Sequence, residues 1–142
     1  MKPYEPFDHP ADIGLIIRGK TQEELFTHAA LGFADLVTDA AALASAVPSV
    51  ERTIRLEAED MPELLFSWLR ELVYLFSASS VVFTRFKFSA LTSGRLEAVA
   101  RGTPFDPARH VSKMEVKAVT RHQFFLSRTP AGGWEARVIF DV

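Results

Sequence analysis

The segment after Asp60 restricts the fold more than any other part of the sequence. Its apolar residues recur at helical spacing and form one stripe of Leu64, Leu65, Trp68, Leu69, Leu72, Val73, Leu75 and Phe76. Asp60 is placed to cap the first turn. A second segment repeats this design, because Thr21 and Glu24 form a capping box ahead of an apolar stripe from Leu25 to Val37. The sequence therefore predicts two amphipathic helices, each of which must bury one face against another layer.

Alternating apolar and polar residues predict β-strands over most of the remaining chain. These segments are residues 12–18, 50–58, 81–88, 95–101, 115–126 and 134–141. Short strands joined by turn sequences pair antiparallel. We therefore expect a single α+β domain over residues 1–142, with two helices packed on one face of a mainly antiparallel sheet. The alanine-rich run at 40–46 either prolongs the first helix or forms a linker that ends before Pro48.

The two strand–helix segments also resemble each other. An offset of 39 residues places Leu15 on Ile54 and Thr21 on Asp60. A duplicated β–α unit would explain this match, and so would the periodicity that any two capped amphipathic helices share. The sequence alone leaves both explanations open.

Composition excludes several classes of protein. The chain has no cysteine, which rules out disulfides, thiolate metal sites and cysteine nucleophiles. The formal net charge is −2, so strong direct binding to nucleic acid is not expected. No apolar run approaches the roughly 20 residues of a membrane span, and we expect a cytoplasmic protein. Phosphate-loop, dinucleotide-binding, GxSxG and HExxH motifs are all absent from the sequence.

Candidate metal ligands lie at the two ends of the chain. The run Asp8–Asp12 precedes the first predicted strand, and Asp141 closes the last. If these strands are antiparallel neighbours, Asp12 and Asp141 approach to about 5 Å between Cβ atoms. Two carboxylates that close repel unless a hard cation such as Ca²⁺ or Mg²⁺ lies between them, and Val142 offers further oxygen from its backbone and terminal carboxylate. The alternative is ordinary turn chemistry at residues 8–12 and a solvated Asp141.

A second group of polar residues lies in the predicted strand at 115–126. Glu115 and Lys117 share one face of it, where they form either an interaction patch or a solvated surface. His122 falls on the less polar face, where a hydrogen-bonded core histidine is expected.

Segments in a fixed order along the chain resemble the archease family. They are Phe7–Gly14, Gly19–Phe26, Leu64–Leu69, Gly102–Pro107, Glu115–Thr120 and Val138–Val142. Departures are small, with Pro10 and Met114 standing where the family more usually has Thr. The resemblance implies an α+β fold and a divalent cation, usually calcium, with Mg²⁺ and Mn²⁺ as alternatives. It implies that Asp12, Asp141 and the backbone of Val142 are the ligands.

The resemblance also implies a protein partner. This is the GTP-dependent RNA ligase of the RtcB type, which joins ends bearing 2′,3′-cyclic phosphate or 3′-phosphate to 5′-hydroxyl. Archeases stimulate its guanylylation and multiple turnover, so the expected role is a non-catalytic activator in tRNA splicing or RNA repair. Glu115 and Lys117 are the candidate partner-facing residues, and Asp8 and His9 are candidate supporting residues. The alternatives are a chaperone-like or scaffold module without a metal-dependent role, or a metal-dependent hydrolase with His9 as base.

Overall fold

The computed structural model describes residues 2–9 and 12–142, and for Asp8 and His9 it describes the backbone alone. The described residues form seven strands and three helices. In chain order these are β1 (Tyr4–His9), β2 (Asp12–Gly19), α1 (Gln22–Val37), α2 (Ala40–Ala44), β3 (Val50–Glu57), α3 (Met61–Ser79), β4 (Val81–Leu91), β5 (Arg95–Pro104), β6 (Ala118–Arg128) and β7 (Trp134–Asp141). None of the described helices is long and apolar enough to cross a lipid bilayer.

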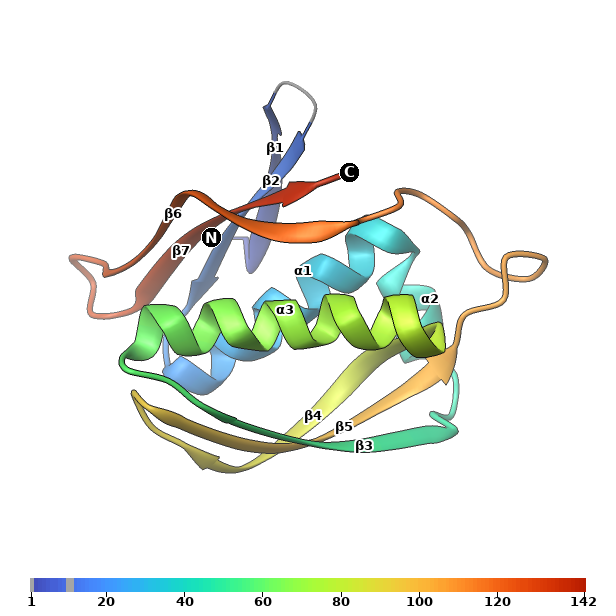
Figure 1. Ribbon diagram of the computed structural model, residues 1–142, viewed down its shortest axis with the longest axis horizontal. Helices are drawn as coiled ribbons and strands as arrows, with labels where there is room; N and C mark the ends of the chain where they lie inside the picture. The colour runs from blue at the N-terminus through green and yellow to red at the C-terminus, as the bar shows by residue number, and fades with distance from the viewer. Residues whose placement is uncertain (1, 10–11) are drawn as a thin grey trace.

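The strands are divided between two antiparallel sheets, with α1 and α3 lying between them (Figure 1). We call the sheet ordered β1-β2-β7-β6 the large sheet, and the sheet ordered β3-β5-β4 the small sheet. The predicted α+β class is confirmed, but the helices lie between two sheets instead of on one face of a single sheet. Helix α1 explains the difference, because its buried residues go beyond one stripe and include Ala29, Ala30, Gly32 and Ala34. A helix that is apolar on more than one side needs cover on both.

The two sheets repeat one topology. In each, the strand before a long helix pairs with the second strand of a later hairpin, so β2-β7-β6 has the same order as β3-β5-β4. The offset of 39 residues seen in the sequence places β2 on β3 and α1 on α3. This equivalence favours the duplicated β–α unit over a chance match of two helices, and it gives each position in one sheet a counterpart in the other.

Both predicted helix caps are present. The Thr21 hydroxyl accepts a hydrogen bond from the Glu24 N–H (3.1 Å), and the Asp60 carboxylate accepts one from the Glu63 N–H (2.9 Å). The Glu24 carboxylate reaches back to the N–H of Lys20 (2.9 Å), one residue before the cap itself. Each cap satisfies backbone donors that the first turn leaves without an intrahelical partner. The alanine-rich run forms the separate helix α2.

Strand β1 was not predicted from the sequence. Pro6 interrupts the alternation there and cannot donate to a ladder. Proline is tolerated in this strand because β1 forms the edge of the large sheet and pairs only with β2. The hairpin of β1 and β2 brings the N-terminal residues beside the strand that carries Asp12.

Candidate functional site

Asp12 and Asp141 face each other across two central strands of the large sheet. Asp12 is the first residue of β2, Asp141 is the last of β7, and the two are paired in the antiparallel register. Directly opposite residues project to the same face of a sheet. This face is the outer one, because the neighbouring pair Ile13 and Phe140 points into the core. The predicted meeting of the two ends of the chain is therefore confirmed.

The row containing the two aspartates extends across the whole sheet. His9 of β1 is paired with Asp12, and Ala118 of β6 is paired with Asp141. Asp8 pairs with Ile13 and so belongs to the next row. The side chains of Asp8 and His9, together with Pro10 and Ala11, lie outside the described residues. The supporting role expected for Asp8 and His9 therefore stays a prediction.

Glu115 and Lys117 lie just outside β6, which begins at Ala118. The prediction that they belong to a strand is wrong, because β7 ends at Asp141 and offers no further ladder partner. The main-chain N–H of Lys117 donates to the carbonyl of Asp141 (2.8 Å), and Val116 is buried in the core. These contacts fix residues 115–117 beside the carboxylate pair, with the side chains of Glu115 and Lys117 exposed. We call this group of Asp12, Asp141, Val142 and residues 115–117 the acidic corner.

The small sheet shows how the fold fills the same position elsewhere. At the register equivalent to the acidic corner, Glu51 of β3 is paired with Arg101 of β5. Their side chains form an ion pair with 3.0 Å between Arg101 Nε and Glu51 Oε1. In the large sheet the guanidinium is replaced by a second carboxylate, Asp141. Two carboxylates therefore meet in the acidic corner at the register where the small sheet pairs a carboxylate with a guanidinium.

The residues of the acidic corner fit a hard divalent cation. Two aspartates can supply up to four carboxylate oxygens, and the Val142 carbonyl adds another, which is the donor chemistry of Ca²⁺ and Mg²⁺. Among the side chains that the structure describes, those of residues 2–7 and 12–142, no cluster of three or more His, Asp or Glu has the geometry to hold a metal on its own. Further oxygens would have to come from water or from a partner.

An aromatic ring covers the outer face next to the acidic corner. Phe7 of β1 is paired with Gly14 of β2, and its ring occupies the space where a side chain of residue 14 would lie. The guanidinium of Arg137 on β7 stacks over the same ring, 4.4 Å from the centroid. Ile139, paired with Gly14, is fully buried although it belongs to the outer face. Sequence reasoning missed this cover, and a glycine inside a strand was the one signal of close approach.

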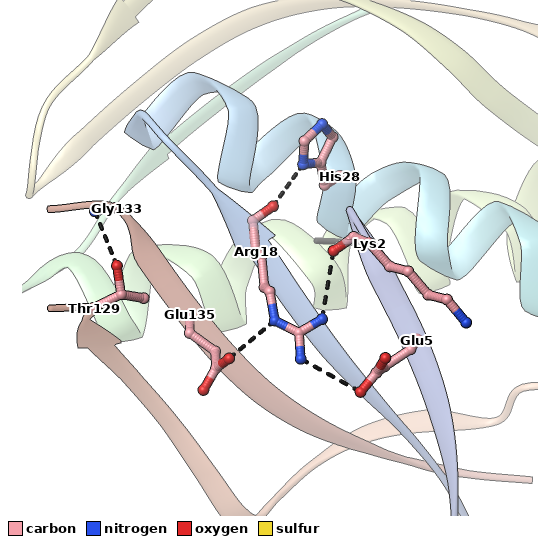
Figure 2. A network of polar contacts seen from close by, with 7 residues as sticks. All are labelled: Lys2, Glu5, Arg18, His28, Thr129, Gly133 and Glu135. Atoms are coloured by element: carbon pink, nitrogen blue, oxygen red, sulfur yellow. Dashed lines mark hydrogen bonds and ion pairs between the residues drawn. The ribbon is translucent and has the colours of Figure 1, made fainter. Parts of the chain in front are cut away.

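The opposite end of the outer face carries a closed polar network (Figure 2). The Arg18 guanidinium donates to the carboxylates of Glu135 (3.0 Å) and Glu5 (3.3 Å), tying β2 to both neighbouring strands. Burial alone would lower the pKa of Arg18, but these two carboxylates outweigh it and raise that pKa. The backbone carbonyl of Arg18 accepts from Nδ1 of His28 on α1 (2.5 Å). Cations and carboxylates are matched here, so this end is structural.

A hollow of about 370 Å³ opens between β1, β2, α1 and the segment before residue 115. Its lining is mainly apolar and includes Ile13, Leu36 and Met114, together with the charged Asp35. Burial raises the pKa of Tyr4 in the same lining, and Asp35 adds to the rise as a nearby charge and hydrogen-bond acceptor.

His122 was expected in the core but is exposed. The register of β6 against β7 shifts between Thr120 and Phe125, and Gln123 has a positive φ of 54°. This irregularity breaks the alternation that placed His122 inside.

The fold and the acidic corner define a small α+β protein in which aspartates from near the two ends of the chain meet on adjacent central strands of one sheet. The sequence matches the Archease protein family (MTH1598/TM1083) over residues 4–142. The chain belongs to that family.

Relatives and solved structures agree with this assignment. The archease of Methanosarcina mazei is 37% identical, over 99% of this chain and 97% of its own length. The archease of Pyrococcus furiosus is also 37% identical, over the full length of both. The solution structure of Methanobacterium thermoautotrophicum protein 1598 has a TM-score of 0.79 at 32% identity, covering both chains completely. A Thermotoga maritima crystal structure, described as an archease and possible chaperone, has a TM-score of 0.67 at 20% identity, over 97% of this chain and 96% of that one, and supports the fold alone.

Proposed function

We propose that this archease is a non-catalytic activator of a GTP-dependent RNA ligase of the RtcB type, acting in tRNA splicing or RNA repair. Asp12, Asp141 and the Val142 carbonyl hold a divalent cation, with Ca²⁺ as the first candidate and Mg²⁺ or Mn²⁺ as alternatives. The observation that carries the proposal is the acidic corner. It gathers two aspartates from opposite ends of the chain and fixes residues 115–117 beside them.

Two groups of residues have different roles in this proposal, one toward the cation and one toward the partner. Asp12 and Asp141 present oxygens from adjacent strands whose spacing the ladder holds fixed. Glu115 and Lys117 stand exposed on a segment anchored by Val116, and they offer one charge of each sign to the partner. When bound, the cation would neutralise the paired carboxylates and polarise a phosphoryl oxygen. In this proposal the ligase supplies the catalytic groups.

Guanylylation of the cognate ligase tests the proposal. The assay compares the ligase alone, with the wild-type chain, and with Asp141→Ala. Stimulation by the wild type and its loss in Asp141→Ala are expected, because the variant removes half of the carboxylate pair without touching the core. Glu51→Ala is the matched control, since it removes the carboxylate at the equivalent register of the small sheet. Full stimulation by Asp141→Ala, or equal loss in both variants, would count against the acidic corner.

A chaperone-like or scaffold module is the second candidate function. The apolar hollow beside β1, and the exposed side chains of Val111 (57%) and Met114 (39%), favour it. In that case pull-down of the ligase would be unchanged by a chelator and weakened by Met114→Asp. Binding that requires the divalent cation would instead support the first proposal.

A further inference from the structure

Arg137 lies on the same outer face as the acidic corner, two outward-facing rows away from it along β7. It belongs to the outer face of β7 together with Asp141, and its guanidinium stacks over Phe7. The Phe7 ring rests on Gly14, whose row is the next one along from the row of Asp12 and Asp141. Adjacent rows on one face are about 7 Å apart along a strand. Stacking therefore brings the Arg137 guanidinium to the ring that covers the Gly14 row, and this row lies between that of Arg137 and that of the carboxylate pair.

The guanidinium of Arg137 does not have all of its donors satisfied by the described residues. Its Nε is buried without a hydrogen-bond partner in the described part of the chain. Arg18 on the same face shows the usual arrangement, with Glu5 and Glu135 both within 3.3 Å of its guanidinium. A guanidinium has five donors, and leaving buried ones unused is costly. Stacking on an aromatic ring offsets part of that cost and fixes the plane of the group.

A fixed guanidinium beside a divalent cation is the arrangement with which proteins hold a phosphoryl group. The guanidinium fork matches two phosphate oxygens, and a cation neutralises the remaining charge. We infer that Arg137, held by Phe7 and Gly14, is the anion-binding residue of the acidic corner and that its ligand is a phosphate group. This inference rests on the proposed function, because two carboxylates without a cation would repel a phosphate. It adds a ligand class and a residue that the cation site alone does not provide.

Titration of the isolated chain with inorganic phosphate in the presence of Mg²⁺ tests the inference by NMR. The Nε–H of Arg137 is buried and should give a slowly exchanging signal in the wild type. We expect phosphate to shift this signal, and acetate at the same concentration to shift it much less. We also expect the phosphate effect to disappear when a chelator removes Mg²⁺. The wild-type measurement needs no variant, so it stands even if substitutions at residue 137 disturb folding.

Phosphate affinities of two arginine variants provide a second test. Arg137→Gln should weaken phosphate binding about tenfold or more, because it removes a charge-assisted pair of hydrogen bonds. The matched control is Arg52→Gln on the small sheet, where the exposed arginine donates to the backbone carbonyl of Glu51, and binding should be unchanged. An unmoved Arg137 signal, or equal phosphate affinity in Arg137→Gln, would overturn the inference. If phosphate binding at Arg137 is refuted but Asp141→Ala still abolishes ligase activation, the proposed function stands without the phosphate site.

Discussion

Substitution of Gly14 by alanine should destabilise the protein, although alanine normally suits a strand better than glycine. A Cβ at residue 14 would lie 2.0 Å from Cζ, 2.2 Å from Cε1 and 2.5 Å from Cε2 of Phe7. No side-chain contact tolerates such distances, so the ring must leave its place and with it the stacked guanidinium of Arg137. Gly14 itself has no left-handed backbone conformation, and alanine adds no backbone strain.

The expected change in the free energy of unfolding is the sum of three contributions. Overpacking that displaces the ring costs about 1–3 kcal/mol. Loss of the cation–π contact with Arg137 adds about 0.5–1 kcal/mol. Alanine also lowers the conformational entropy of the unfolded chain, which offsets the loss of stability by about 0.4–1 kcal/mol. Gly14→Ala should therefore lower the free energy of unfolding by about 1–3 kcal/mol, measured by urea denaturation with circular dichroism detection.

The double variant Phe7→Ala/Gly14→Ala tests whether the loss of stability comes from the clash with the Phe7 ring. With Phe7→Ala already in place, the ring is gone, and Gly14→Ala should be neutral or stabilising by about 0.5 kcal/mol. The coupling energy between the two positions should reach about 2 kcal/mol. An alanine that stabilises the wild type, or that costs the same free energy with and without Phe7, would refute the reasoning about the ring.

Two further predictions concern the core and the hollow. Trp68→Phe should lower the free energy of unfolding by about 2–4 kcal/mol in urea denaturation, because it removes the hydrogen bond from the buried indole N–H to the Phe26 carbonyl (2.9 Å) and leaves a cavity where the larger ring was packed. In a Tyr74→Phe variant, which leaves one tyrosine, phenolate absorbance should show Tyr4 ionising above the ordinary pKa of about 10. Because the folded pKa is the raised one, the stability that Tyr4 contributes is complete below pH ~10 and is lost as pH rises through the folded pKa. Asp35→Asn should lower that pKa, and an unchanged titration would show that Asp35 has no part in it.

Patterns of alternation and capping could predict much of the fold. The helix starts follow from Thr21 and Asp60, whose side chains can satisfy the first-turn donors whatever the tertiary structure. The meeting of Asp12 and Asp141 followed from one further assumption, that the first and last long strands are antiparallel neighbours. The register confirms that assumption.

Other features depend on tertiary partners that a single segment does not reveal. The predicted strand at 115–126 begins three residues too early, because the start of β6 depends on where its partner β7 stops, at Asp141. The division into two sheets depends on how α1 is covered from both sides. The stacking of Arg137 on Phe7 requires the register of three strands at once, and only Gly14 hinted at it.

We propose above that Asp12 and Asp141 share one divalent cation. Isothermal titration calorimetry of the metal-free chain with Ca²⁺ tests it most directly. We predict one site in the wild type, its loss in both Asp12→Asn and Asp141→Asn, and its retention in Glu51→Gln, where Arg101 already supplies the positive charge. Undiminished Ca²⁺ binding in the two aspartate variants, or equal loss in Glu51→Gln, would contradict the account.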